Sequence, residues 1–299
     1  MASRKNPSKM SAGFGRFGKS QPLTRLSGVE TSIESDFFFR GEGTVRYARW
    51  RQSRQLLSVL DMAMTARIVL ANVRTRKAAC RTPTQTVLLA GIEVPGREND
   101  LARVIERILE STRHNVSVAT TRMRPVGKFE NINSALLNQD LSGYDWLLVI
   151  DDDIEVPDRL LDLLIYFSEK HNLKLAQPAH KFKSHKSFTI TERHWGSQAR
   201  NTQFIESGPV SLFHRDTFPD LIPFPALRWT WGIDVYWADM AKRRGWRMGI
   251  VDAAPIRHLR PVGGSYDMSI ARKEAIDFLK AASVRISREE VFRLNCRIS

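Results

Sequence analysis

Short apolar runs alternate with amphipathic segments through the first half of the body of the chain. The apolar runs have the length of β-strands and lie at residues 86–92, 115–120, 146–150 and 173–177. The segments between them space apolar residues at helical intervals; the first starts at Asp100 and carries apolar residues as far as Leu109, and the others lie at residues 129–138 and 158–170. Asp100 is the expected N-cap of the first helix, and Pro157 suits the first turn of the third. This alternation predicts an α/β fold with a mainly parallel sheet and helices on both faces.

The second half of the body has a less regular pattern. It predicts a strand at 204–213, a Pro-rich loop at 218–225, a helix at 233–244 and a strand at 248–251. The tail from residue 269 has a helical pattern. No internal repeat is visible.

The N-terminal region differs from the body in composition. Residues 1–43 are rich in Ser, Gly, Lys and Arg, which predicts disorder. From about residue 44 to residue 77, Trp50, Leu57 and Met64 recur on one helical stripe beside several arginines. This helix could pack on the body or lie on an anionic membrane surface; binding to nucleic acid is less favoured. The predicted organisation is a disordered basic segment (1–43), a basic amphipathic helix (44–81) and a catalytic domain (82–299).

Charge and cysteine content narrow the classes of protein further. The formal net charge is +14, and residues 1–81 hold 16 Lys and Arg against 5 Asp and Glu, so the basicity belongs mainly to the extension. Cys80 and Cys296 lie far apart without metal-ligand spacing, which is typical of free thiols. No signal peptide or run of about 20 apolar residues is apparent. We therefore expect a cytoplasmic protein, with peripheral contact at the inner face of the membrane as an option.

The clearest chemical signal is the acidic run Asp151-Asp152-Asp153, which directly follows five apolar residues. Adjacent carboxylates at a buried strand end need a cation, and ligands of open parallel sheets bind at this edge. A divalent ion such as Mn²⁺ or Mg²⁺ suits these oxygen ligands and can bridge to a diphosphate. We expect Asp153 to bind the metal and Asp151 to bind the metal or a ribose. The alternative is a solvated turn.

A second group of residues combines aromatic rings with a carboxylate. Trp231 and Gly232 precede Asp234, and Trp237 follows it. Rings can cover the apolar face of a sugar, and Asp234 could serve as the general base for an acceptor hydroxyl. The alternative is an aromatic core cluster with Asp234 as a helix cap.

Four further residues are candidates for binding a nucleotide or metal. Lys128 precedes a predicted helix and could reach phosphates, and Arg260 could neutralise a leaving diphosphate. Gly208 would let a sugar approach the backbone closely, although a strand bulge explains it equally well. His258 follows an apolar strand and could complete a metal site, although a lone histidine is more often structural.

These motifs together resemble the GT-A class of nucleotide-sugar glycosyltransferases, in particular its family 2. The matching segments are LLVIDDD, FIESGPVSLF, WGIDVYW and GIVDAAPIRH, at residues 147–153, 204–213, 231–237 and 249–258. The order is most similar to a plant and bacterial family of unassigned function that itself has the GT-A pattern. The resemblance covers about residues 84–268.

The resemblance implies a GT-A-like fold and a metal-dependent hexosyltransferase that moves a sugar from a nucleotide-sugar donor to an acceptor hydroxyl. Asp151 and Asp153 would take the DxD role, with Asp152 beside them. Asp234 would be the base and His258 a late metal ligand. The aspartate that reads the nucleobase in many relatives is missing at residues 120–124, which leaves the nucleotide open.

Two other classes of protein compete with this interpretation. One is a non-catalytic binding module derived from a transferase, and the other is a phosphohydrolase of the haloacid dehalogenase type. The latter is weakened by Glu155, which stands where that fold places Thr or Val. The sequence leaves open the donor sugar, the stereochemical outcome, the oligomeric state and the acceptor, which could be a sugar, a lipid-linked group or a protein.

Overall fold

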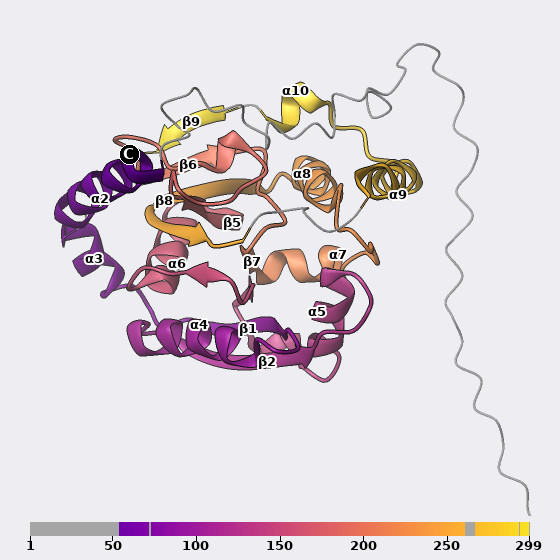
Figure 1. Cartoon of the computed structure of the whole chain (residues 1–299), viewed down its shortest axis with the longest axis horizontal. Helices are drawn as coiled ribbons and strands as arrows, with labels where there is room; N and C mark the ends of the chain where they lie inside the picture. Colours follow the sequence, from indigo (N-terminus) through magenta and orange to yellow (C-terminus); the bar gives the residue numbers. More distant parts are fainter. Residues whose placement is uncertain (1–53, 72, 261–266, 293, 299) are drawn as a thin grey trace, which may run out of the picture. The chain divides into compact units, whose positions relative to one another are not determined.

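A computed structural model of the chain describes residues 54–71, 73–260, 267–292 and 294–298. The predicted segment at 1–43 and the start of the predicted helix lie outside the described residues. Helices flank a central sheet (Figure 1). The helices are α2 (Arg54–Ala71), α3 (Val73–Ala79), α4 (Glu98–Ser111), α5 (Lys128–Leu136), α6 (Leu160–His171), α7 (Phe218–Leu221), α8 (Ile233–Arg244), α9 (Met268–Ala281) and α10 (Arg288–Val291). The strands are β1 (Thr86–Glu93), β2 (Asn115–Arg122), β3 (Trp146–Ile150), β4 (Ile154–Glu155), β5 (Leu173–His180), β6 (Ala199–Thr202), β7 (Val210–His214), β8 (Arg247–His258) and β9 (Leu294–Ile298).

The sheet has the strand order β2-β1-β3-β7-β5-β8-β6-β9, and β4 pairs with β8. Strands β2, β1 and β3 run parallel, as expected, and so do β5 and β8. Strand β7 is antiparallel to both β3 and β5, and β6 is antiparallel to β8 and β9. The α/β fold with flanking helices is therefore confirmed, but the sheet is mixed and not mainly parallel. Periodicity indicates which segments form strands, and it carries no information on their direction.

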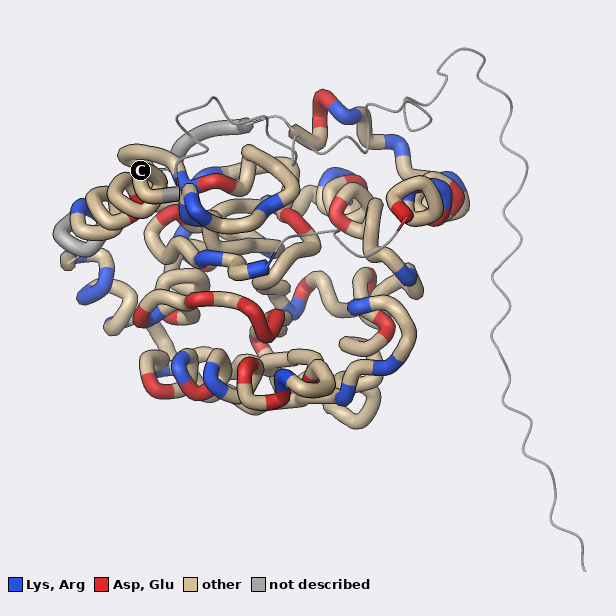
Figure 2. Tube along the Cα trace, in the orientation of Figure 1, with Lys and Arg blue, Asp and Glu red and all other residues tan. Residues whose placement is uncertain are grey.

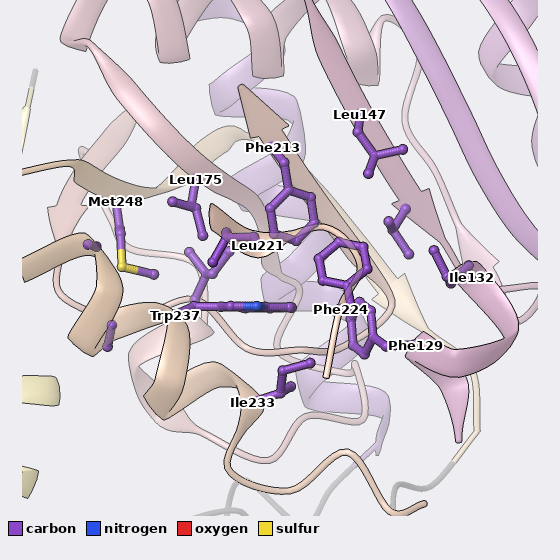
Figure 3. Packing of buried hydrophobic residues seen from close by; sticks show 14 of the residues in the cluster. Phe129, Ile132, Leu147, Leu175, Phe213, Leu221, Phe224, Ile233, Trp237 and Met248 are labelled. Carbon is purple, nitrogen blue, oxygen red and sulfur yellow. The ribbon is translucent and has the colours of Figure 1, made fainter. Parts of the chain in front are cut away.

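Alternate residues of the central strands face two separate hydrophobic layers. On one face, Leu88 and Leu147 pack with residues of α5 and α8. On the other, Leu89 and Leu148 pack with residues of α4 and α6. Figure 3 shows the first layer, in which Trp237 lies among phenylalanines. A sheet covered on both faces explains why its strands read as continuous apolar runs.

Several element boundaries differ from those predicted. Asp100 lies inside the first turn of α4, and Arg97 occupies the N-cap position. Pro157 precedes α6, which begins only at Leu160. The strand predicted at 204–213 begins only at Val210, because Pro209 lacks the N–H group that a ladder needs. Strand β6 was not predicted.

Helix α2 packs on the body of the protein. Leu57, Asp61 and Met64 lie on one stripe of the helix and are buried, whereas Leu56 and Met62 on its outer side are exposed. Within the described part of the chain, no helix is long and apolar enough to cross a membrane. Positively and negatively charged residues occur together along most helices of the described body (Figure 2).

Candidate metal and donor site

Three side chains at the end of β3 and β8 could share one metal ion. Asp151 and Asp153 follow β3 directly, and His258 ends β8. One ligand atom from each of the three residues lies within 4.8 Å of the others. Two carboxylate oxygens and one imidazole nitrogen suit Mn²⁺ or Mg²⁺, with the nitrogen favouring Mn²⁺. The residues present therefore fit a divalent metal.

Pairing between β4 and β8 brings Asp153 and His258 together. Ile154 lies opposite His258 in this antiparallel pair, and the Leu259 N–H donates to the Asp153 carbonyl over 2.9 Å. The side chains then meet, with His258 Nε2 3.2 Å from Asp153 Oδ1. Residues more than a hundred positions apart are thus fixed by backbone pairing, which holds potential ligands rigidly.

Lys128 connects Asp151 to the segment that precedes β7. Its Nζ lies 2.7 Å from Asp151 Oδ1 and donates to the Gly208 carbonyl over 2.7 Å. The Asp151 N–H in turn donates to the Pro209 carbonyl over 2.9 Å. Lys128 begins α5, where the helix dipole adds to its positive charge. The site therefore holds a fixed cation beside the proposed ligands.

The ionisation of the three candidate ligands reflects burial and pairing. Burial raises the pKa of Asp151 against the opposing effect of Lys128. For Asp153, burial alone would raise the pKa, but the hydrogen bond and charge of His258 outweigh it and the pKa is lowered. Burial would lower the pKa of His258, but the Asp153 carboxylate raises it. The contact between Asp153 and His258 therefore favours the ionised form of both side chains.

Asp152 points to different partners from its two neighbours. Arg97 Nη1 lies 3.3 Å from its Oδ2, and Arg260 Nη1 lies 3.7 Å from the same atom. Arg260 also contacts Asp100, with Nη2 3.2 Å from Oδ2. Burial, together with the charges of Asp151 and Asp153, raises the pKa of Asp152 to about 6 in spite of Arg97. Two guanidinium groups thus lie beside the proposed metal site.

Asp234 lies in the first turn of α8 and is buried. Its carboxylate accepts a hydrogen bond from the Val235 N–H over 2.9 Å, and the nearby Ser207 backbone acts to lower its pKa. Burial, with the nearby charge of Glu206, raises its pKa to about 7. Lys128 Nζ lies 3.4 Å from the Ser207 carbonyl, so the 207–208 backbone joins Asp234 to the Asp151 side of the site.

The aromatic residues around Asp234 divide between core and surface. Trp231 is half-buried, and Gly232 caps α8 with a φ of +85°. Trp237, which we expected to line a sugar pocket, is fully buried and makes edge contacts with Phe129 and Phe213 (Figure 3). That part of the prediction is wrong, because α8 turns Trp237 toward the sheet.

The structure therefore gathers Lys128, Asp151, Asp152, Asp153, Gly208, His258 and Arg260, with Asp234 next to them. Their roles as ligands or base remain predictions. The sequence analysis did not identify three residues that contact or influence this group. Arg97 contacts Asp152, the charge of Glu206 acts on Asp234, and Ser184 Oγ accepts from the His258 N–H. Arg97 follows β1, whose carboxyl end adjoins that of β3. Because ligands of such sheets bind beyond the carboxyl ends of the strands, its position in the sequence could have indicated it. Glu206 belongs to the quoted FIESGPVSLF segment. No sequence signal indicates Ser184.

Comparison with solved structures gives matches of low sequence identity. GalNAc-T7, solved with UDP, GalNAc and Mn²⁺, matches with a TM-score of 0.49 and 11% identity over 67% of this chain and 48% of that chain. The catalytic domain of Drosophila β1,4-galactosyltransferase 7, in complex with xylobiose, matches with a TM-score of 0.43 and 15% identity over 64% of this chain and 80% of that chain. A197 from STIV matches with a TM-score of 0.39 and 14% identity over 59% and 86%.

The chain thus spans about half the length of GalNAc-T7. No family model matches the sequence, and no curated protein matches it either. The resemblance to the plant and bacterial family stays a prediction. At these TM-scores the chemistry of the protein has to be derived from its own site residues.

Proposed function

We propose that the protein is a metal-dependent glycosyltransferase, which moves a sugar from a nucleotide-sugar donor to an acceptor hydroxyl. The observation that carries the proposal is the group Asp151, Asp153 and His258 at the ends of β3 and β8, with Lys128 beside it. Carboxylates, an imidazole and a fixed ammonium at a strand end suit a metal-bound diphosphate.

In this proposal each residue has a defined task. Asp151, Asp153 and His258 would hold Mn²⁺ or Mg²⁺, which when bound neutralises charge on the diphosphate as it leaves. Lys128 and the guanidinium groups of Arg97 and Arg260 would add positive charge on the same side. Because Arg97 and Arg260 lie against Asp152, their orientation is set before the donor binds.

Asp234 would accept the proton of the acceptor hydroxyl. A hydroxyl group is a weak nucleophile near neutral pH and needs a base within hydrogen-bond reach. A pKa of about 7 suits this task, since about half of the carboxyl groups are ionised at neutral pH and the carboxylate is more basic than that of an exposed aspartate. The backbone of residues 207–208, whose carbonyl groups accept from Lys128, also influences the Asp234 carboxylate, which supports a place for Asp234 beside the donor. The identities of the donor and acceptor remain open.

A turnover screen tests the proposal. Release of nucleoside diphosphate from a panel of nucleotide sugars should be measured with and without Mn²⁺, with generic phosphate esters as a comparison. We expect Mn²⁺-dependent release from at least one nucleotide sugar and none of the phosphate-ester cleavage that a phosphohydrolase would give. Metal-dependent cleavage of the esters alone would reject the transferase.

A further inference from the structure

Helix α2 lies against the turn that holds the end of β8. The turn comprises residues 181–185 and closes with a hydrogen bond from the Ser184 N–H to the Lys181 carbonyl, over 3.0 Å. On one side it contacts β8, and on the other it contacts Asp61 of α2. Helix α2 is therefore separated from the proposed metal ligand His258 only by the 181–185 turn.

Asp61 holds this turn with both carboxylate oxygens. Its Oδ1 accepts from the Phe182 N–H over 2.8 Å, and its Oδ2 accepts from the Lys183 N–H over 2.9 Å. Arg193 Nη1 lies 3.2 Å from Oδ1 and is buried with it. A buried carboxylate that is satisfied by two backbone donors and one guanidinium fixes its partners strongly. Helix α2 thus sets the position of the 181–185 turn.

This turn fixes the end of β8 by three hydrogen bonds, two to the backbone of His258 and one to that of Ile256. The His258 N–H donates to Ser184 Oγ over 2.8 Å, and the His185 N–H donates to the His258 carbonyl over 3.1 Å. Two residues upstream in β8, the Ile256 carbonyl accepts from the Lys181 N–H over 2.8 Å. Ser184 is itself buried and contacts the fully buried His180 ring, with Oγ 2.8 Å from Nδ1.

We infer that Asp61 is a positioning residue for the metal site, acting through the 181–185 turn and Ser184 on His258. Helix α2 then supports the proposed metal site through Asp61. The inference rests on the proposed function, because it takes His258 as a metal ligand. Partners of metal ligands typically alter metal affinity by roughly 10- to 100-fold when they are removed.

The test is a Mn²⁺ titration of the full chain, in which electron paramagnetic resonance counts the free Mn²⁺. Asp61→Asn and Ser184→Ala should each weaken Mn²⁺ binding by roughly 10- to 100-fold. Because both act along one path, the double variant should bind no more weakly than the weaker single variant. Asp277→Asn is the matched control, since Asp277 is exposed on α9 and pairs only with Lys273 among the described residues.

Asp61→Asn also removes the charge that balances the buried Arg193, which could prevent folding. Asp61→Glu is therefore included, because it keeps the charge and displaces the carboxylate by one methylene group; it should weaken Mn²⁺ binding as well. Lower melting temperatures with unchanged Mn²⁺ affinity in the Asp61 and Ser184 variants would overturn the inference alone. Failure of the wild-type chain to bind Mn²⁺ would overturn both the inference and the metal site.

Discussion

Three adjacent aspartates take three different partners in this protein. Asp151 contacts Lys128, Asp152 contacts Arg97, and Asp153 contacts His258. The chain bends at Asp152 and Asp153, and the Asp152 carboxylate lies beside guanidinium groups, whereas its neighbours contact a lysine and a histidine. The three aspartates therefore suit two different roles. Asp151 and Asp153 are suited to a metal, and Asp152 orients arginines.

At the same scale, Asp234→Asn tests the proposed base. The amide keeps the size of the side chain and can still accept the Val235 N–H, but it cannot take a proton. We expect kcat to fall by roughly 10²- to 10⁴-fold. Donor affinity and melting temperature should change little, and both are measured beside kcat by steady-state kinetics and thermal unfolding.

Asp239→Asn is the matched control for that variant. Asp239 is buried on the same helix and accepts the N–H groups of Arg285 and Ile286, each over 3.0 Å. Its loss should lower the melting temperature and leave kcat near the wild-type value. If Asp234→Asn behaves like this control, Asp234 is a structural residue of α8.

The pH dependence of turnover follows from the raised pKa of Asp234. Below its pKa of about 7 the carboxyl is protonated and cannot act as a base, so kcat/KM should fall about tenfold per pH unit below neutrality. Above pH 7 the profile should become flat. Kinetics across this range check the shape of the curve; a flat profile from pH 5 to 7 would exclude Asp234 as the titrating base.

The site residues differ in how far sequence could predict them. Asp151 and Asp153 were predictable, because three acids after a buried run conflict with desolvation unless a cation is near. Ser184 and Asp61 were not, because their importance comes from hydrogen bonds to distant backbone groups. Asp61 bonds to residues 182 and 183, which lie more than a hundred positions away.

Among the secondary-structure elements, β3 could be predicted from its sequence and β6 could not. Strand β3 is five buried apolar residues, so its sequence alone indicates it. Strand β6 reads Ala-Arg-Asn-Thr and looks like a surface loop. Its Arg200 is nonetheless buried, because its Nε lies 2.9 Å from Oδ2 of the buried Asp252. A strand whose burial depends on a long-range ion pair leaves no periodic signal.

The start of α5 gives a prediction about an element. Gly127 precedes Lys128, and a Cβ atom at Gly127 would lie 1.9 Å from the Leu227 carbonyl oxygen. Gly127→Ala should therefore destabilise the protein by about 1–3 kcal/mol, because backbone would have to move. It should also weaken donor binding by shifting Lys128. Thermal unfolding and nucleotide titration measure the two effects.

Gly143→Ala serves as its control, since no atom lies within 4 Å of a Cβ at that glycine. That variant should keep the wild-type melting temperature. Equal melting temperatures for both alanine variants would show that the 227–228 segment does not pack against α5 as described.

At the scale of the whole molecule, alternating strand and helix patterns were enough to predict an α/β fold with helices on both faces. The two apolar layers confirm it, since alternate residues of β1 and β3 belong to different layers. The antiparallel insertion of β7 between β3 and β5 was not predictable from periodicity. The apolar stripe of α2 favoured packing on the body, and Leu57 and Met64 of that stripe are buried there, but the contribution of buried Asp61 was not predictable from periodicity. Contact of residues 44–81 with a membrane and the cytoplasmic location stay predictions.

The proposed function requires that the group Asp151, Asp153 and His258 at the ends of β3 and β8 binds a metal and a nucleoside diphosphate together. Isothermal titration of a panel of nucleoside diphosphates, with and without Mn²⁺, tests it most directly. Asp153→Asn removes a proposed ligand, and Asp158→Asn is the control, because Asp158 is exposed and pairs with Arg107 at the surface. We expect Mn²⁺-dependent binding of at least one diphosphate by wild type and Asp158→Asn, and none by Asp153→Asn. Binding by Asp153→Asn as tight as wild type, or no binding by wild type to any member of the panel, would contradict the account.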